Sequence, residues 1–174
     1  MRRAVALDDS VAPPLLLTLI AAQRADEAIA EARKVLERDP GVFLAYIALG
    51  HSHIMKGELA KALDIYERLP QTMSFHPMLL AGKGHVLGRM GRREEAVQIL
   101  AQLDQLSTKT YVSPIMRSMV LLGLDDMVGW RQTIRKAYEE RVPGLPIWNQ
   151  IWKWHPSHAD PVYREIITKM GLPL

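Results

Sequence analysis

A fixed step of 34 residues relates a set of small side chains in this sequence. Glycine inside a helix costs roughly 1 kcal/mol relative to alanine, so glycines that recur at one spacing indicate a structural need. The need is either close contact between two helices or a turn with positive φ. A step of this length accommodates two helices and predicts stacked helical hairpins. The residues related by the step are Gly50 and Gly84, Gly57 and Gly91, and Ala28, Ala62 and Ala96.

The step aligns three segments that each combine a turn with an amphipathic helix. Each segment follows another apolar-periodic stretch of about 13 residues. We expect Gly50 and Gly84 to let the second helix of a hairpin approach the first, and Gly57 and Gly91 to turn the chain with positive φ. The aligned segments are QRADEAIAEARKVL, MKGELAKALDIYERL and RMGRREEAVQILAQL.

A fourth hairpin continues the pattern less regularly, in YVSPIMRSMVLLGLDD and MVGWRQTIRKAYEER. Ser118 keeps a small side chain one step after Gly84. Trp130, however, stands one step after Ala96, and an indole cannot pack where a methyl group does. We therefore expect the last hairpin to splay or rotate relative to the others.

This pattern resembles the tetratricopeptide repeat family, most clearly at Leu49, Gly50, Gly57, Ala62 and Tyr66. The resemblance implies an all-α fold, a right-handed solenoid of helical hairpins with about three and a half to four repeats and C-terminal capping helices. We expect one domain over residues 1–174, with a truncated second helix of a preceding repeat at 1–9, repeats at 10–42, 43–76, 77–110 and 111–142, and capping helices at 143–174. The expected helices cover residues 11–23, 25–38, 42–56, 58–70, 76–90, 92–105, 112–124, 126–141, 146–154 and 159–170.

The end of the chain, HADPVYREIITKMGLPL, resembles the close of the repeat segment in many bacterial multidomain regulatory proteins. That resemblance implies a bacterial regulatory or scaffold protein, or a stand-alone relative. Asp160 and Pro161 fit the cap and the first residue of a final helix. Trp148, Trp152 and Trp154 lie just before them. They suit an aromatic platform for a ligand, but sealing the open core of the last repeat is the favoured interpretation.

The resemblance also implies a concave groove lined by the first helix of each hairpin. A protein or peptide partner would bind there, with apolar anchors at Ile47, Ile54, Met55 and Met119. Polar selection would come from His51, His85 and Arg89. The expected groove residues are Leu17, Ile20, Ala21, Leu44, Ile47, His51, Ile54, Met55, Met78, Ala81, His85, Gly88, Arg89, Ile115, Met119 and Leu122.

Two features of these positions refine the expected partner. The family's clamp for peptide carboxylates needs Lys and Asn where this chain has Ile47 and His51, so chaperone tails are disfavoured. The groove is apolar and contains methionine, which suits adaptable contacts. Its occupant is therefore an external peptide or helix, the chain's own C-terminal helices, an apolar small molecule, or a second copy of the chain. The last two would make this a ligand-sensing or self-associating domain that forms a homo-oligomer.

Residue types argue against enzymatic and metal chemistry. The sequence contains no cysteine, which excludes disulfides, thiolate catalysis and cysteine-ligated zinc. It also lacks the GxSxG, HExxH and P-loop patterns. His51 and His85 should lie on adjacent helices about 10 Å apart, which is long for two ligands of one metal ion. We expect no catalytic residue, no cofactor and no metal.

Net charge and hydropathy limit which other partners, and which cellular location, we expect for this protein. The net charge is only +3, with basic and acidic residues interspersed, so we expect no nucleic-acid contact. No apolar run approaches the ~18 residues that span a bilayer. Arg2 and Arg3 precede an apolar run, as in a short signal peptide, but Asp8 and Asp9 stand between them. A cytoplasmic protein is the favoured interpretation.

Overall fold

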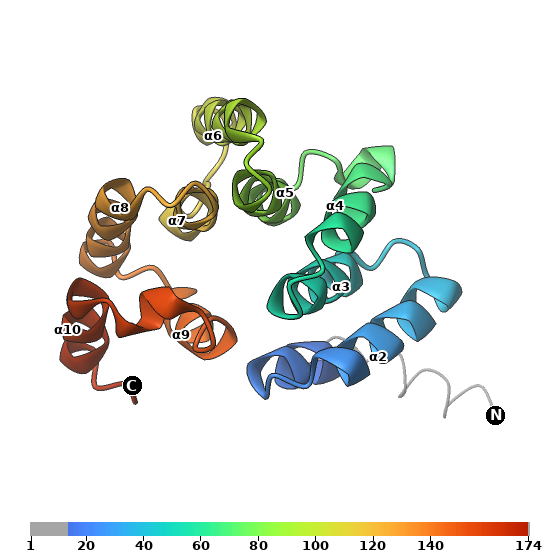
Figure 1. Cartoon of the computed structure of the whole chain (residues 1–174), viewed down its shortest axis with the longest axis horizontal. Helices are drawn as coiled ribbons and strands as arrows, with labels where there is room; N and C mark the ends of the chain where they lie inside the picture. Colours follow the sequence, from blue (N-terminus) through green and yellow to red (C-terminus); the bar gives the residue numbers. More distant parts are fainter. Residues whose placement is uncertain (1–13, 174) are drawn as a thin grey trace. The chain divides into compact units, whose positions relative to one another are not determined.

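The computed structural model describes residues 14–173, and every described element is helical or irregular. The predicted truncated helix at residues 1–9 lies outside the described residues. The chain divides into two compact units, Met1–Met73 and Ser74–Leu174. Each unit is an arrangement of helical hairpins, which agrees with the predicted all-α fold of the tetratricopeptide type (Figure 1).

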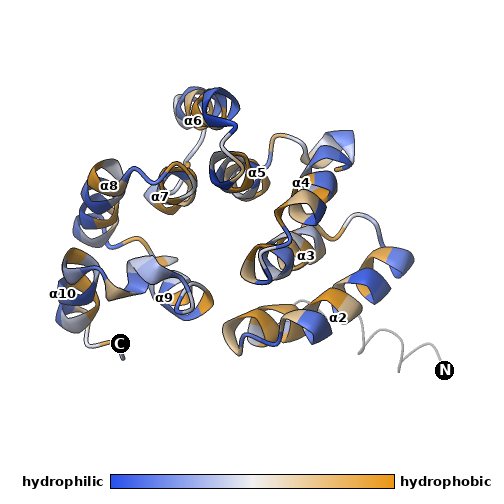
Figure 2. Cartoon of the chain, viewed as in Figure 1, coloured by the Kyte–Doolittle hydropathy of each residue, from blue (hydrophilic) through white to orange (hydrophobic). Residues whose placement is uncertain are grey.

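The first unit contains two hairpins. A helix over residues 14–21 pairs with α2, and α3 pairs with α4. Helix α2 is amphipathic: it buries Ala28, Ile29, Ala32 and Val35 on one side and carries charged residues on the other (Figure 2). The helix bounds are Ala25–Arg38 for α2, Phe43–Met55 for α3 and Leu59–Glu67 for α4, followed by the 3₁₀ turn η1 at Gln71–Met73.

The second unit contains two further hairpins and a C-terminal segment. Helix α5 packs on both α6 and α7, and α8 packs on α7 (Figure 1). Pro77, Pro114 and Pro161 occupy first-turn positions of their helices, where the missing N–H costs nothing. The bounds are α5 Pro77–Arg89, α6 Arg93–Ser107, α7 Pro114–Gly123, α8 Met127–Glu139, α9 Leu145–Ile151, η2 Pro156–Ala159 and α10 Pro161–Lys169. Helix α9 thus ends earlier than the predicted 154, and η2 was not predicted.

The recurring glycines have the two roles that the sequence predicts. A Cβ atom on Gly50 would overlap the phenol ring of Tyr66 on α4. One on Gly84 would lie 2.8 Å from a methyl carbon of Val120 and 2.9 Å from one of Ile99. Both glycines therefore permit close helix contact within their own units.

The turn position recurs more widely than glycine does. Gly57 and Gly91 have φ values of 72° and 78°, as predicted, and nothing lies within 4 Å of a Cβ built on either. Gln23 and Asp125, at the same step of the repeat, have φ values of 60° and 57°. All four hairpins thus use a left-handed residue here, and two of them do so at the steric cost that a side chain adds.

The backbone contact between α5 and α7 in the second unit was not predicted. A Cβ on Gly88 would lie 2.5 Å from the carbonyl carbon of Gly123, and one on Gly123 would lie 2.6 Å from the Cα of His85. Helices α5 and α7 therefore touch backbone to backbone at this point. The repeat pattern placed Gly88 only in the groove and assigned no role to Gly123.

The repeat alanines lie in the core, and so does Trp130. Ala28, Ala62 and Ala96 are all fully buried. Trp130 is fully buried as well, with its ring 5.7 Å from that of Tyr163 on α10. The indole therefore fills space against the C-terminal helix. The predicted splaying of α7 and α8 stays a prediction.

Candidate partner-binding surface

The predicted groove residues of the first unit differ in exposure. They come from the helix of residues 14–21 and from α3. Ile20, His51 and Ile54 are buried. Leu17, Ile47 and Met55 are half-buried, so their side chains retain surface that another molecule can contact. Of the predicted apolar anchors in this unit, Ile47 and Met55 are thus the accessible ones.

The predicted groove residues of the second unit lie on α5 and α7. His85 and Met119 are buried, Met78 is half-buried and Arg89 is exposed. The Nδ1 atom of His85 lies 3.0 Å from the carbonyl oxygen of Met119, so the structure brings these two together across the α5–α7 contact. The His85 ring is thus engaged within the unit, and Arg89 is the accessible polar residue of the set.

The chain's own C-terminal segment covers His85. The rings of Trp152 and His155 pack edge-on against His85, with centroids 5.0 Å and 6.1 Å away. Trp148 and Trp152 stack at 4.7 Å, one helical turn apart, and Trp152 stacks on Trp154 at 5.5 Å. Trp148 and Trp152 are also buried. The tryptophans therefore form a packed stack of which Trp152 lies against α5, in the third repeat, and the predicted sealing of the last repeat's core stays a prediction.

A pocket of about 750 Å³ lies beside this stack, lined in part by Arg89, Trp154, His155 and Asp160. Burial, followed by the positive charge of Arg89, lowers the pKa of His155 to about 4. The imidazole is therefore neutral at neutral pH. Arg89 forms no ion pair within the part of the chain that the structure describes. The pocket thus presents a guanidinium beside neutral aromatic rings.

Asp160 orders the segment next to this pocket. Its Oδ1 accepts hydrogen bonds from the backbone N–H groups of Val162 and Tyr163, at 3.0 and 3.4 Å, which confirms the predicted cap. Its Oδ2 accepts from Arg131 on α8, from Nη2 at 2.8 Å and Nε at 2.9 Å. The carboxylate therefore ties α10 to α8.

A second polar cluster in the C-terminal segment was not predicted from the sequence. The Oδ1 of Asn149 accepts from the Tyr163 hydroxyl at 3.1 Å and contacts Nε2 of His158 at 2.8 Å. Its Nδ2 donates to the carbonyl oxygen of Pro173 at 3.0 Å. Burial lowers the pKa of His158 and raises that of Tyr163. No periodic signal marks a lone Asn, so only the fold reveals this cluster.

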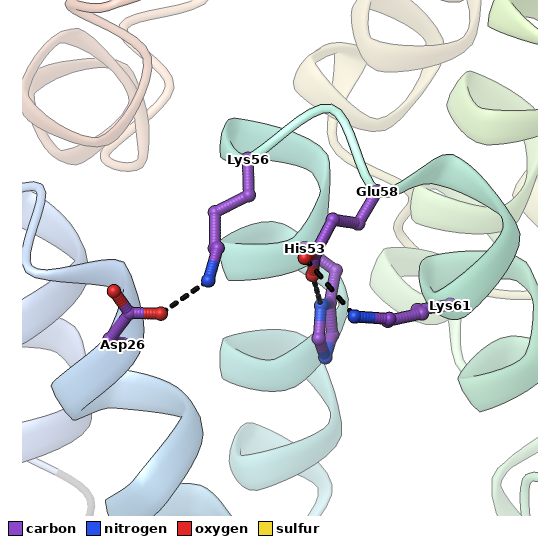
Figure 3. A network of polar contacts seen from close by, with 5 residues as sticks. All are labelled: Asp26, His53, Lys56, Glu58 and Lys61. Carbon is purple, nitrogen blue, oxygen red and sulfur yellow. Dashed lines mark hydrogen bonds and ion pairs between the residues drawn. The ribbon is translucent and has the colours of Figure 1, made fainter.

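A charged network in the first unit was also missed (Figure 3). His53, on the face of α3 away from His51, lies with Nδ1 2.6 Å from Oε2 of Glu58. Lys61 Nζ donates to Oε1 of the same carboxylate at 3.1 Å. Lys56 pairs with Asp26 of α2 and so links the two hairpins. The i, i+3 spacing of Glu58 and Lys61 is the signal that could have indicated part of it.

The described residues contain neither of two other kinds of site. None of the described helices is long and apolar enough to cross a lipid bilayer. Among residues 14–173, no three His, Asp or Glu side chains are gathered as they would be around a metal ion.

Comparison with known proteins bears on the first unit and the start of α5. Residues 19–79 match the family model described as tetratricopeptide repeat. No curated protein and no solved structure matches the chain. The match covers α2, α3 and α4 together with the first two turn positions, Gln23 and Gly57. The hairpins, the left-handed turns and the family match agree, and together they support the tetratricopeptide repeat family for this segment.

Proposed function

We propose that this chain is a protein-interaction module that binds an apolar helix or peptide of a partner protein. Tetratricopeptide repeats in general mediate protein–protein interaction and typically do no catalysis. The proposed surface is the groove face of the first helix in each hairpin. Its proposed residues are Leu17, Ile20, Ile47, His51, Ile54 and Met55 in the first unit, and Met78, His85, Arg89 and Met119 in the second.

The proposal rests on one observation: in the second unit, a segment of the same chain already lies on this face. There α5 packs a Trp-rich segment of the same chain against His85. A face that packs an aromatic segment in cis has the chemistry to accept one in trans. His51 is the residue one step before His85, and its neighbours Ile47 and Met55 are half-buried.

The chemistry of the first unit's face indicates the kind of partner. Ile47 and Met55 lie two helical turns apart on α3, the spacing of anchors that an amphipathic helix can match. Methionine adapts its shape to varied apolar side chains. The partner's contacting face should therefore be apolar, with aromatic or aliphatic anchors at i, i+3, i+4 or i+7.

Two finer parts of the proposal rest on the sequence alone. The chain end resembles the close of repeat segments in bacterial regulatory proteins, so we place the chain in a bacterial regulatory or scaffold protein. The proposed location is cytoplasmic.

The test uses a displayed library of amphipathic helical peptides selected on the full chain. The affinity of a selected peptide is then measured by fluorescence polarisation. Ile47→Glu combined with Met55→Glu should weaken binding at least tenfold, because two charges would be buried against the peptide. Val97→Glu, at an exposed apolar position on α6, is the matched control and should leave the affinity unchanged.

Two results would contradict the proposal. One is a selected peptide whose affinity survives the double substitution. The other is equal weakening by Val97→Glu, which would mean nonspecific apolar binding. Light scattering without peptide checks that the chain is a monomer under the same conditions, since a second copy on this face would compete with the peptide.

A further inference from the structure

A second pocket, of about 470 Å³, lies within the first unit and away from the proposed partner-binding surface. Its lining comes from α2, α3 and α4, including Arg33, Leu49, His53, Lys61, Asp64 and Arg68. His53 is two residues after His51, and helical residues two apart point about 200° apart around the axis. The pocket is therefore a separate feature of the same hairpins.

The pocket lining is positively charged. Arg33, Lys61 and Arg68 bring three cations, against one carboxylate of Asp64. Arg68 Nε pairs with Asp64 Oδ1 at 2.6 Å, with both side chains more than half exposed, at 79% and 54%. Such exposed pairs contribute little and exchange readily. Arg33 has no ionic partner within residues 14–173. The lining residues carry an excess of two positive charges, and the Glu58 carboxylate, which lies 3.1 Å from Lys61 Nζ, reduces this excess to one.

The buried imidazole of His53 also lines this pocket. The His53 side chain is only 5% exposed, and Glu58 holds its Nδ1. The hydrogen bond from His53, followed by that from Lys61, lowers the pKa of Glu58, so the carboxylate is ionised and acts only as an acceptor. His53 Nδ1–H therefore donates to it. The Nε2 atom lies at the opposite edge of the ring (Figure 3) and has no hydrogen-bond partner in the described part of the chain.

We propose that this pocket binds a phosphate group. At pH 7 a phosphate monoester exists in part as its monoanion, which offers anionic oxygens to the cations and one P–OH donor, whereas an ionised carboxylate offers no donor. Arg33 and the free guanidinium N–H groups of Arg68 suit two phosphate oxygens. The His53 tautomer that donates Nδ1–H to Glu58 leaves Nε2 as an acceptor, and Nε2 accepts the hydrogen bond of the P–OH group. Leu49 and Ile65 give the pocket an apolar wall.

The phosphate group belongs to a small phosphate monoester or to a phosphorylated side chain. Both present the same phosphate oxygens to the pocket. A pocket of this volume is at the small end of ligand sites. It admits a phosphate and the few atoms attached to it.

The test is a titration of the isotope-labelled full chain with inorganic phosphate. The NMR signal of the His53 Cε1–H group is monitored at each phosphate concentration. The ionic strength is held constant with chloride. We expect a saturable shift of this signal. Arg33→Gln should raise the dissociation constant at least fivefold, and this exposed residue can change without unfolding the chain. Arg135→Gln, an exposed arginine on α8 in the other unit, is the matched control and should leave the constant unchanged.

Three outcomes would overturn the proposal: a shift linear in phosphate, an equal response to acetate, or unchanged affinity in Arg33→Gln. O-phosphoserine and a phosphoserine peptide with neutral flanks form two further arms. Tighter binding of the peptide assigns the site to a phosphorylated side chain, and tighter binding of free phosphoserine assigns it to a small molecule. Ile47→Glu with Met55→Glu should leave phosphate affinity intact, so this test is independent of peptide binding.

Discussion

The two units use one repeat pattern but join their hairpins by different chemistry. In the second unit, α5 and α7 meet through the bare backbone at Gly88 and Gly123, and a tryptophan stack lies against the neighbouring His85. In the first unit, α2 packs on α3, and the Lys56–Asp26 ion pair adds a link near the surface. Exposed ion pairs contribute little to stability, whereas buried aromatic contacts contribute several kcal/mol. The comparison shows that equivalent positions of a repeat share their backbone geometry. The contacts made at those positions can still contribute very different free energies.

Removing the tryptophan stack should give the largest effect and confine it to the second unit. Trp152→Ala deletes a buried indole that touches Trp148, Trp154, His85 and His155, and should cost about 3–5 kcal/mol of unfolding free energy. Chemical denaturation measures the loss, and hydrogen exchange locates it. Faster exchange in α5 and α7 with unchanged α2 and α3 is expected. An equal loss of hydrogen-exchange protection in both units would contradict the view that the tryptophan stack stabilises the second unit alone.

A methyl group at the α5–α7 contact should have the next largest effect. Gly123→Ala places a Cβ against the backbone of His85, which cannot rotate away, and should cost about 3 kcal/mol. Gly50→Ala is the matched change in the first unit. It meets the movable side chain of Tyr66 and should cost less. Melting temperatures of the two variants decide the order, and the reverse order would refute the backbone-contact interpretation.

Acidification should weaken the second unit more than the first through His155. Burial lowers its pKa to about 4 in the folded chain, below the ordinary value of 6.5, so the unfolded chain takes up a proton first. The neutral ring therefore stabilises the fold above pH 6.5, and this contribution is lost as the pH falls from about 6.5 to about 4. Urea unfolding across this range measures the loss. His155→Gln should flatten the profile, and an unchanged slope in that variant would contradict the assignment.

The smallest effects should come from the left-handed turns, and their sign should depend on the residue present. Gly57→Ala and Gly91→Ala should each cost about 1 kcal/mol, because only backbone strain is added. Asp125→Gly and Gln23→Gly relieve that strain and should stabilise by up to about 1 kcal/mol. Thermal unfolding of the four variants checks the signs. Destabilisation by both glycine substitutions would show that the side chains of Gln23 and Asp125 make contacts that outweigh the strain.

Much of the fold follows from local sequence signals. The bounds of α2 agree with the prediction at Ala25 and Arg38, because an amphipathic face and a left-handed turn delimit it. The candidate surface was harder to predict. His51 and His85 share a repeat position and are both buried, and for His85 the cover is a segment about 70 residues later in the chain. A repeat period carries no information on such a distant contact.

The sequence alone determined the helical hairpins, their turn positions and the small residues between them, because these depend on neighbours within one repeat. Only the tertiary structure decided that the Trp148–Trp152 stack covers His85, that Gly88 meets Gly123, and that Arg33, His53 and Lys61 converge on one pocket. The physical reason is that the 34-residue step sets which side each residue faces. What lies against that side depends on side-chain volumes and charges elsewhere in the chain.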